Sequence, residues 1–130
     1  MVNEGELLEK FNIKIHPVTL AEVKDEMDAV EQNKKDEVIQ VIDYLKKETI
    51  IEISDEALVK VAALKVAIKS IAKRYNCKAA AVQCWNAMQG VLGIFPCAAN
   101  ALLTDEKFPV ACETDIHGAI TSIIAQGCVN

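Results

Sequence analysis

Two acids and a histidine follow directly on a short apolar run near the end of the chain. The run is Val110–Cys112, and the polar residues are Glu113, Asp115 and His117. Carboxylates and imidazoles hold divalent cations and move protons near neutral pH. Ligands of open parallel sheets bind beyond the carboxyl ends of the strands. If the apolar run is such a strand, these side chains are candidates for metal binding or proton transfer.

A second polar cluster follows the apolar residues 79–82 and combines two amides, a thiol and an indole. Its members are Gln83, Cys84, Trp85 and Asn86. An indole ring packs on the C–H groups of a sugar, while amides and acids bind its hydroxyls. This mixture predicts a polyhydroxylated ligand. The predicted substrate-binding residues of the two clusters are Gln83, Trp85, Asn86 and His117.

Helices with clear start and stop signals separate these stretches. Thr19 and Glu22 have the spacing of a capping box, Ser54 precedes a long amphipathic run, and Asn76 is a plausible left-handed stop for it. The apolar stripe after Thr19 is interrupted at residues 31–35, which predicts one interrupted helix or two. The other predicted helices are residues 6–10, 54–76, 97–104 and 116–126, the last ending at Gly127, and the predicted strands are residues 11–18, 78–85 and 108–112.

A small apolar strand preceded by an amphipathic helix is typical of a β-α-β crossover. We therefore predict an α/β fold, a three-layer Rossmann-like domain with a small parallel sheet flanked by helices. Residues 1–130 are long enough for one such domain, and their composition (52% apolar, 5% aromatic) predicts an aliphatic core. In a right-handed parallel unit, strands 78–85 and 108–112 can be neighbours, which would bring both polar clusters into one crevice.

Charge and composition exclude several classes of partner. The net charge of −5 provides no basic face, so no nucleic acid is expected. No apolar run approaches the roughly 20 residues of a membrane span, and the acidic N-terminus does not resemble a secretory signal. The chain is therefore expected to be cytoplasmic, without a membrane partner. Five cysteines without a C-x-x-C pair predict reduced thiols, and no glycine-rich phosphate-binding motif is present.

Three segments carry a family resemblance. They are residues 81–87 (Ala-Val-Gln-Cys-Trp-Asn-Ala), 93–97 (Gly-Ile-Phe-Pro-Cys) and 109–119 (Pro-Val-Ala-Cys-Glu-Thr-Asp-Ile-His-Gly-Ala). They resemble the L-fucose/L-arabinose isomerase superfamily, in particular its fucose isomerase-like branch. The match covers most of the chain and is most specific between residues 79 and 126. Because members are several hundred residues long, the resemblance implies an internal domain or fragment of a larger isomerase-like protein.

The resemblance implies a metal-dependent aldose–ketose isomerase that is oligomeric and uses Mn²⁺ or another divalent metal such as Mg²⁺. Asp115 falls at the position of a metal-binding aspartate in a Glu-x-Asp run, and Glu113 matches the glutamate of that run. On this basis both residues are predicted as catalytic residues and metal ligands. Carboxylate oxygens suit such a cation, which binds two adjacent sugar oxygens and stabilises an enediolate while a carboxylate moves the proton.

The chain departs from the fucose isomerase pattern in two ways. Residues 90–104 contain no acid, so an additional catalytic glutamate of the family has no counterpart, and the distant ligand histidine lies beyond Asn130. We therefore expect this piece to contribute part of a metal and sugar site and to be inactive alone. The expected partners are a sugar substrate, the flanking domains of the parent protein and further copies in a homo-oligomer.

Simpler interpretations remain open for the candidate residues. Asp115 fits the N-cap of the following helix, Glu113 a solvated acid near its start, and His117 a first-turn residue. Trp85 fits a residue that closes the end of a small core. A zinc site or a reactive cysteine at the strand ends lacks paired ligand spacing or a local base. The alternative function is a non-catalytic α/β interaction or oligomerisation module whose exposed apolar faces mediate self-association.

Overall fold

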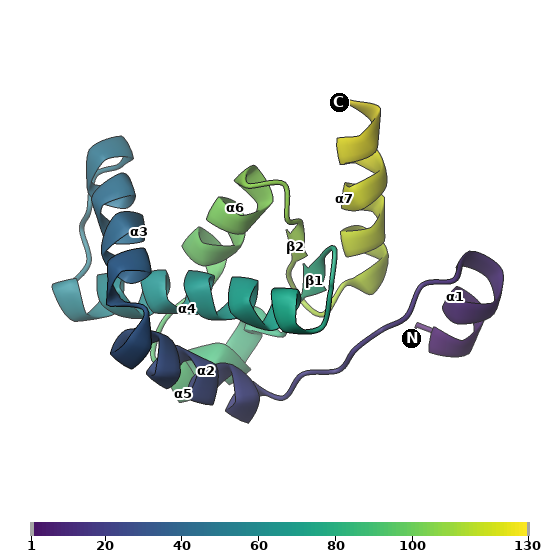
Figure 1. The fold of residues 1–130 in the computed structure, drawn as a ribbon, viewed down its shortest axis with the longest axis horizontal. Helices are drawn as coiled ribbons and strands as arrows, with labels where there is room; N and C mark the ends of the chain where they lie inside the picture. The colour runs from purple at the N-terminus through teal and green to yellow at the C-terminus, as the bar shows by residue number, and fades with distance from the viewer. Residues whose placement is uncertain (1, 130) are drawn as a thin grey trace.

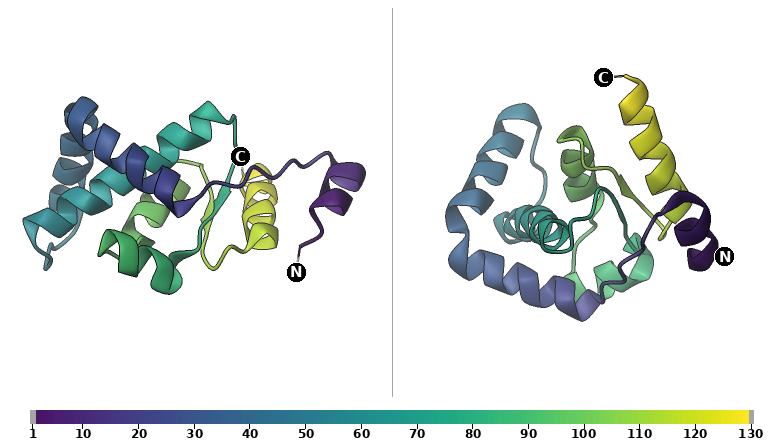
Figure 2. Two further views of the ribbon diagram at one scale, coloured as in Figure 1. Left: turned by 90° about the horizontal axis from the view of Figure 1, so that it is seen from below. Right: turned by 45° about the vertical axis from the view of Figure 1, so that its right-hand side comes forward.

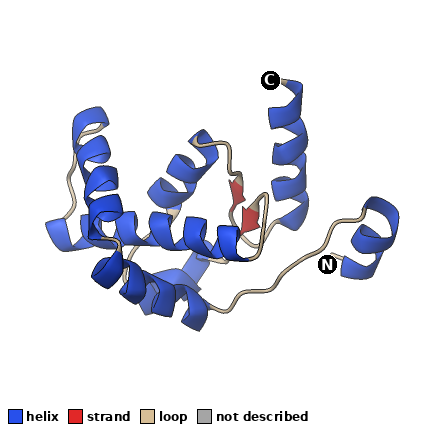
Figure 3. Cartoon of the chain, in the orientation of Figure 1, coloured by secondary structure: helices blue, strands red, loops and turns tan. Residues whose placement is uncertain are grey.

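The computed structural model describes residues 2–129, and 68% of these residues are helical. Figure 3 shows one small parallel sheet among the helices, formed by β1 (Ala80–Ala81) and β2 (Val110–Ala111). The prediction of an α/β, three-layer Rossmann-like domain is therefore wrong. Two of the three predicted strands are reduced to these two-residue strands, and residues 11–18 do not form a strand.

Local features explain why the strands are short or missing. Phe11 ends a helix, and Asn12 adopts a left-handed conformation (φ 54°) before the alternating apolar residues begin. Pro17 lacks the N–H that a strand ladder requires, and so does Pro109 directly before β2. Just beyond β2, Glu113 has a φ of 56°, which takes the chain out of the extended conformation. The alternation of apolar and polar residues at 11–18 therefore does not correspond to a strand.

Helices α2 (Leu20–Asn33) and α3 (Lys35–Glu48) show that the interrupted stripe after Thr19 belongs to two helices. Thr19 caps α2 as predicted, because its Oγ1 accepts a hydrogen bond from the Glu22 N–H at 3.2 Å. The chain breaks at Lys34, whose backbone leaves the helical region (φ −126°, ψ 38°). Figure 1 shows α3 turned away from α2 at this break.

Helix α4 (Asp55–Arg74) is the central element of the fold. It is capped as predicted by Ser54, whose Oγ accepts a hydrogen bond from the Ala57 N–H at 3.2 Å. Every residue from Val61 to Ile68 is buried, because α4 packs against α2, α3 and α6 (Cys97–Asp105). The core between these helices is aliphatic, as the composition predicted. Its most buried members include Val30, Leu58, Leu64 and Leu103.

The elements that follow α4 build the region around the sheet. An irregular turn η1 (Cys84–Met88), in which Trp85 and Asn86 are not helical, and the short α5 (Gln89–Leu92) follow β1, and α6 leads to β2. Helix α7 (Ile116–Cys128) comes last and buries only Ala119. It extends through Gly127, so the prediction that this glycine ends the helix is wrong.

Helix α1 (Glu4–Phe11) lies at the far end of an extended linker, as both views in Figure 2 show. The linker is attached to the end of α4 by a ring stack of His16 on Tyr75, with centroids 3.7 Å apart. Among residues 2–129, no single helix is long and apolar enough to cross a membrane. One pair, Cys84–Leu92 with Cys97–Asp105, meets that test only jointly and is bent by 111°.

Candidate functional site

The parallel pairing of β1 and β2 brings the two polar clusters together. Ala80 is in register with Val110, and Ala81 with Ala111. Beyond this ladder, the carbonyl oxygen of Val82 accepts hydrogen bonds from the N–H groups of Cys84 and Thr114, each at 3.0 Å. The loops after the two strands therefore lie side by side. The predicted adjacency of these strand ends is confirmed, although the sheet has only two strands.

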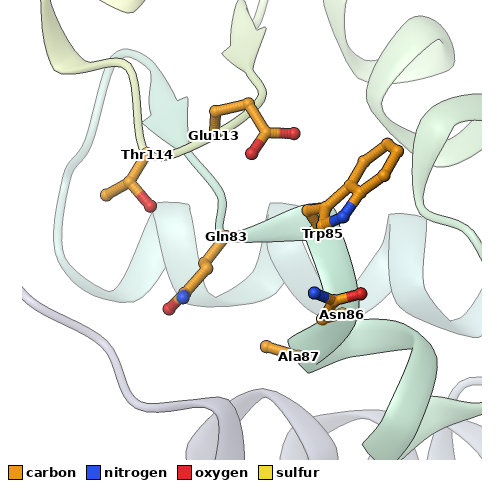
Figure 4. Close-up of a pocket in the computed structure, with 6 residues that line it drawn as sticks. All are labelled: Gln83, Trp85, Asn86, Ala87, Glu113 and Thr114. Atoms are coloured by element: carbon orange, nitrogen blue, oxygen red, sulfur yellow. The ribbon is translucent and has the colours of Figure 1, made fainter.

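An open cavity of about 590 Å³ lies between these loops. Figure 4 shows the side chains around it, with the Glu113 carboxylate and the Trp85 ring on the same side of the opening. Three of the four predicted substrate-binding residues and one of the two predicted acids line the cavity. The lining residues are Gln83, Trp85, Asn86, Ala87, Glu113 and Thr114.

The backbone on both sides of the cavity is strained. Asn86 has φ 58° and ψ −47°, Glu113 has φ 56° and Thr114 has φ 54°. Positive φ is uncommon outside glycine and is a marked outlier for a β-branched residue such as threonine. Each such residue costs on the order of 1–3 kcal/mol, and such residues cluster at binding and catalytic sites. Three of them around one cavity support its assignment as the candidate site.

Glu113 receives a hydrogen bond from a buried thiol. Cys84 Sγ donates to Glu113 Oε1 at 3.1 Å. Burial raises the pKa of the Cys84 thiol, and the hydrogen bond to Glu113 raises it further. The thiol therefore stays protonated and acts as a donor near neutral pH, which orients one oxygen of the Glu113 carboxylate.

Asp115 and His117 do not line this cavity. Asp115 is the N-cap of α7, and its Oδ1 accepts a hydrogen bond from the Gly118 N–H at 2.9 Å. This is the simpler interpretation that the sequence had left open. His117 is exposed in the first turn of α7, where its carbonyl accepts a hydrogen bond from the Thr121 hydroxyl at 2.8 Å. Trp85 is 66% exposed, so it does not close the end of a core.

The donor set does not fit a complete metal site within this chain. Among residues 2–129, no three His, Cys, Asp or Glu side chains lie close enough to hold one metal ion. Glu113 is the acid that lines the cavity, while an oxygen of Asp115 caps α7. Because three such donors do not converge among residues 2–129, the zinc site considered for the strand-end cysteines is not supported.

Sequence reasoning missed Thr114, which lines the cavity between the two predicted acids. Its position inside the Glu-x-Asp run was the one available signal. A second polar group near the site also escaped prediction. Asn100 on α6 is buried and donates to Cys112 Sγ at 3.5 Å, while its Oδ1 has no hydrogen-bond partner among the described residues.

Comparisons with known proteins point to sugar isomerases. The chain is 28% identical over 125 residues to the sulfoquinovose isomerases of Priestia aryabhattai and Priestia megaterium, and 28% identical over 121 residues to that of Alkalicoccus urumqiensis. These alignments cover 95%, 95% and 92% of this chain but 27% of each relative, so the chain spans about a quarter of their length. No family model and no solved structure matches the chain. The resemblance to sugar isomerases is thereby supported, whereas the fucose isomerase-like branch is not confirmed.

Proposed function

We propose that this chain is part of a sugar aldose–ketose isomerase and supplies one wall of its substrate site. The observation that carries the proposal is the cavity between the two strand ends, where a carboxylate, amides, a hydroxyl and an exposed indole meet. The similarity to sulfoquinovose isomerases extends across almost the whole chain and supports the same class of substrate. Because those relatives are far longer, we propose that the chain turns over no sugar alone.

The neutral groups of the cavity are the proposed sugar-binding groups. The exposed face of Trp85 packs on sugar C–H groups, and the amides of Gln83 and Asn86 bond to the hydroxyls. The Thr114 hydroxyl adds a group that both donates and accepts. Asn86 and Thr114, which both have positive φ, line the same open cavity.

The proposed role of Glu113 is proton transfer. In the enediol route between an aldose and a ketose, a base removes the proton beside the carbonyl and returns it to the former carbonyl carbon. A carboxylate within hydrogen-bonding reach of a bound sugar performs such a transfer. The Cys84 thiol holds one carboxylate oxygen by a hydrogen bond, and Glu113 lines the cavity. This role does not depend on a cation held by this chain alone.

The test is a sugar titration monitored by tryptophan fluorescence, since Trp85 is the one tryptophan of the chain. Sulfoquinovose and an unsulfonated aldose serve as ligands, and methanesulfonate controls for the anion. We expect a saturable change with sugar that weakens at least threefold in Gln83→Ala and in Asn86→Gly, where glycine accommodates the positive φ. His117→Ala, outside the cavity, should bind as the wild type does. A flat titration with every sugar would contradict the proposal.

A second candidate function is self-association, and the surface of α7 favours it. The helix contains no Asp, Glu, Lys or Arg, and Ile124 is 62% exposed on it. On α1, Leu8 and Phe11 are likewise exposed. Exposed apolar side chains on a helix without charges favour an interaction site. We propose a second copy of the chain as the partner of α7, in addition to the sugar site.

A further inference from the structure

Cys84 and Cys112 lie at the ends of two paired strands. Cys112 follows β2 directly, and the Val82 N–H donates to the Ala111 carbonyl of the neighbouring strand at 2.9 Å. The Cys84 N–H then donates back to the Val82 carbonyl at 3.0 Å, which holds Cys84 beside the end of β1. Neighbouring strands are about 4.8 Å apart. The ladder register sets Val82 beside Cys112, and the hydrogen bond from Cys84 to Val82 turns the chain so that Cys84 stays at this end of the sheet. A disulfide forms where two Cα atoms come within about 4.4–6.8 Å of each other.

The side chain of Cys84 also lies against the segment that follows β2. Cys84 Sγ lies 3.1 Å from the carboxylate of Glu113, the residue next to Cys112. The Cys112 thiol in turn is among the groups that raise the pKa of Cys84. The two thiols differ in accessibility, because Cys84 is buried and Cys112 is exposed. Such a pair has an outer thiol for a reagent to reach and an inner thiol to complete the bond.

We propose that Cys84 and Cys112 form an intramolecular disulfide bond on reaction with a small-molecule disulfide, and that this bond ties together the two loops lining the cavity. The Cys112 sulfur attacks one sulfur of the reagent, and its proton leaves with the first released thiol. The Cys84 sulfur then attacks Cys112 in the mixed disulfide, and its proton leaves with the second released thiol. Two protein thiols are oxidised, and one small-molecule disulfide is reduced to two thiols.

The bond has a direct consequence at the cavity. In the reduced protein, Cys84 uses its hydrogen to donate to Glu113 Oε1. Oxidation removes that hydrogen, so the Glu113 carboxylate loses its thiol donor while both loops become covalently linked. Disulfide formation would therefore switch the environment of Glu113 whether or not a sugar is the ligand of this site.

Peptide mapping after treatment with oxidised glutathione tests the bond. Trypsin cleaves after Lys78 and Lys107, so the disulfide would join peptides 79–107 and 108–130. Each peptide also contains an exposed cysteine outside the pair, Cys97 or Cys128. The double variant Cys97→Ser/Cys128→Ser leaves the proposed pairing as the one possible link between the two peptides. We expect that link in the double variant and its loss when Cys112→Ser is added.

Fluorescence supplies a second readout, because Trp85 follows Cys84 directly. Oxidation of the double variant should change the emission of Trp85, and dithiothreitol should reverse the change. Cys112→Ser removes an exposed thiol, which is a mild change to the fold, and should abolish the response. A stable glutathione adduct on Cys112 beside a free Cys84, or disulfides formed only between chains, would overturn the proposal.

Discussion

At the scale of single residues, Thr114 lines the cavity in a strained backbone conformation that lowers the stability of the fold. Its φ of 54° is unfavourable for a β-branched residue, and it lies between the two acids of the Glu-x-Asp run. Local strain of this kind persists where the surrounding structure determines the conformation. Here the Thr114 N–H is held by the Val82 carbonyl at 3.0 Å.

Thr114→Gly should therefore raise the free energy of unfolding by about 1 kcal/mol, because glycine adopts positive φ without the steric cost. The same change should weaken sugar binding, since it removes a hydroxyl from the cavity. Urea unfolding measures the first effect and the fluorescence titration the second. Thr104→Gly in α6 is the matched control and should lower stability instead. Loss of stability in Thr114→Gly would show that the backbone is not strained there.

Asp115 allows the capping and metal-binding interpretations to be separated. Asp115→Ala should lower the free energy of unfolding by about 1 kcal/mol, because α7 loses its N-cap hydrogen bond. Asp115→Asn keeps a capping oxygen and should lose much less. Millimolar Mn²⁺ should leave the melting temperature of all three proteins unchanged, since three donors do not converge among the described residues. A Mn²⁺-induced increase in the wild type that Asp115→Asn abolishes would restore the metal-ligand prediction.

At the scale of elements, Glu106 links α4 to the turn that follows α6. Its carboxylate pairs with Lys65 and Lys69 of α4, and Lys65 is buried with 7% exposure. Burial of Glu106 opposes ionisation, but the two lysines outweigh it and lower the pKa of this carboxyl. An acid with a lowered pKa in the folded state stabilises the protein above its unfolded-state pKa, and this contribution is lost as the pH falls through the folded value.

Glu106→Gln should therefore destabilise the protein at pH 7 by about 1 kcal/mol, a value discounted because the Glu106 side chain is 38% exposed. The difference from the wild type should shrink as the pH falls below the ordinary value of 4.5. The midpoints of urea unfolding of both proteins, measured at pH 7 and below pH 4.5, give this stability difference. Asp105→Asn, at the neighbouring position, should show a smaller effect at pH 7. An equal difference at both pH values would rule out the ion pairs as its source.

The sequence predicted helices better than strands, and capping chemistry explains the difference. Thr19, Ser54 and Asp115 each accept a backbone N–H three residues on, a local interaction that one segment can display by itself. A strand needs a partner that pattern alone does not reveal, so residues 11–18 were assigned wrongly. The candidate site was partly predictable for the same reason. The polar clusters at the strand ends were visible, but the φ values at Asn86 and Thr114 and the Cys84–Glu113 contact arise only after folding.

At the scale of the whole molecule, the core and the periphery differ sharply. Helices α2, α3, α4 and α6 surround a common core, whereas Ala119 is the one fully buried residue of α7 and α1 lies at the end of its linker. Large apolar side chains of α1 and α7 are exposed to water, for example Phe11 at 67% and Ile124 at 62%. A second copy of the chain would remove them from solvent, at about 25 cal/mol per Å² of apolar surface.

We therefore expect concentration-dependent self-association through α7, measured by sedimentation velocity or light scattering. Ile124→Lys places a charge on the helix surface and should shift the equilibrium toward monomer by at least tenfold in the dissociation constant. Ile50→Lys is the matched control, because Ile50 is 91% exposed outside the helices and its loss should leave association unchanged. If both variants associate like the wild type, the interface does not involve Ile124. If the wild type stays monomeric at every concentration, the apolar face of α7 is not a site of self-association, and the sugar-site proposal is unaffected because its cavity residues lie outside α7.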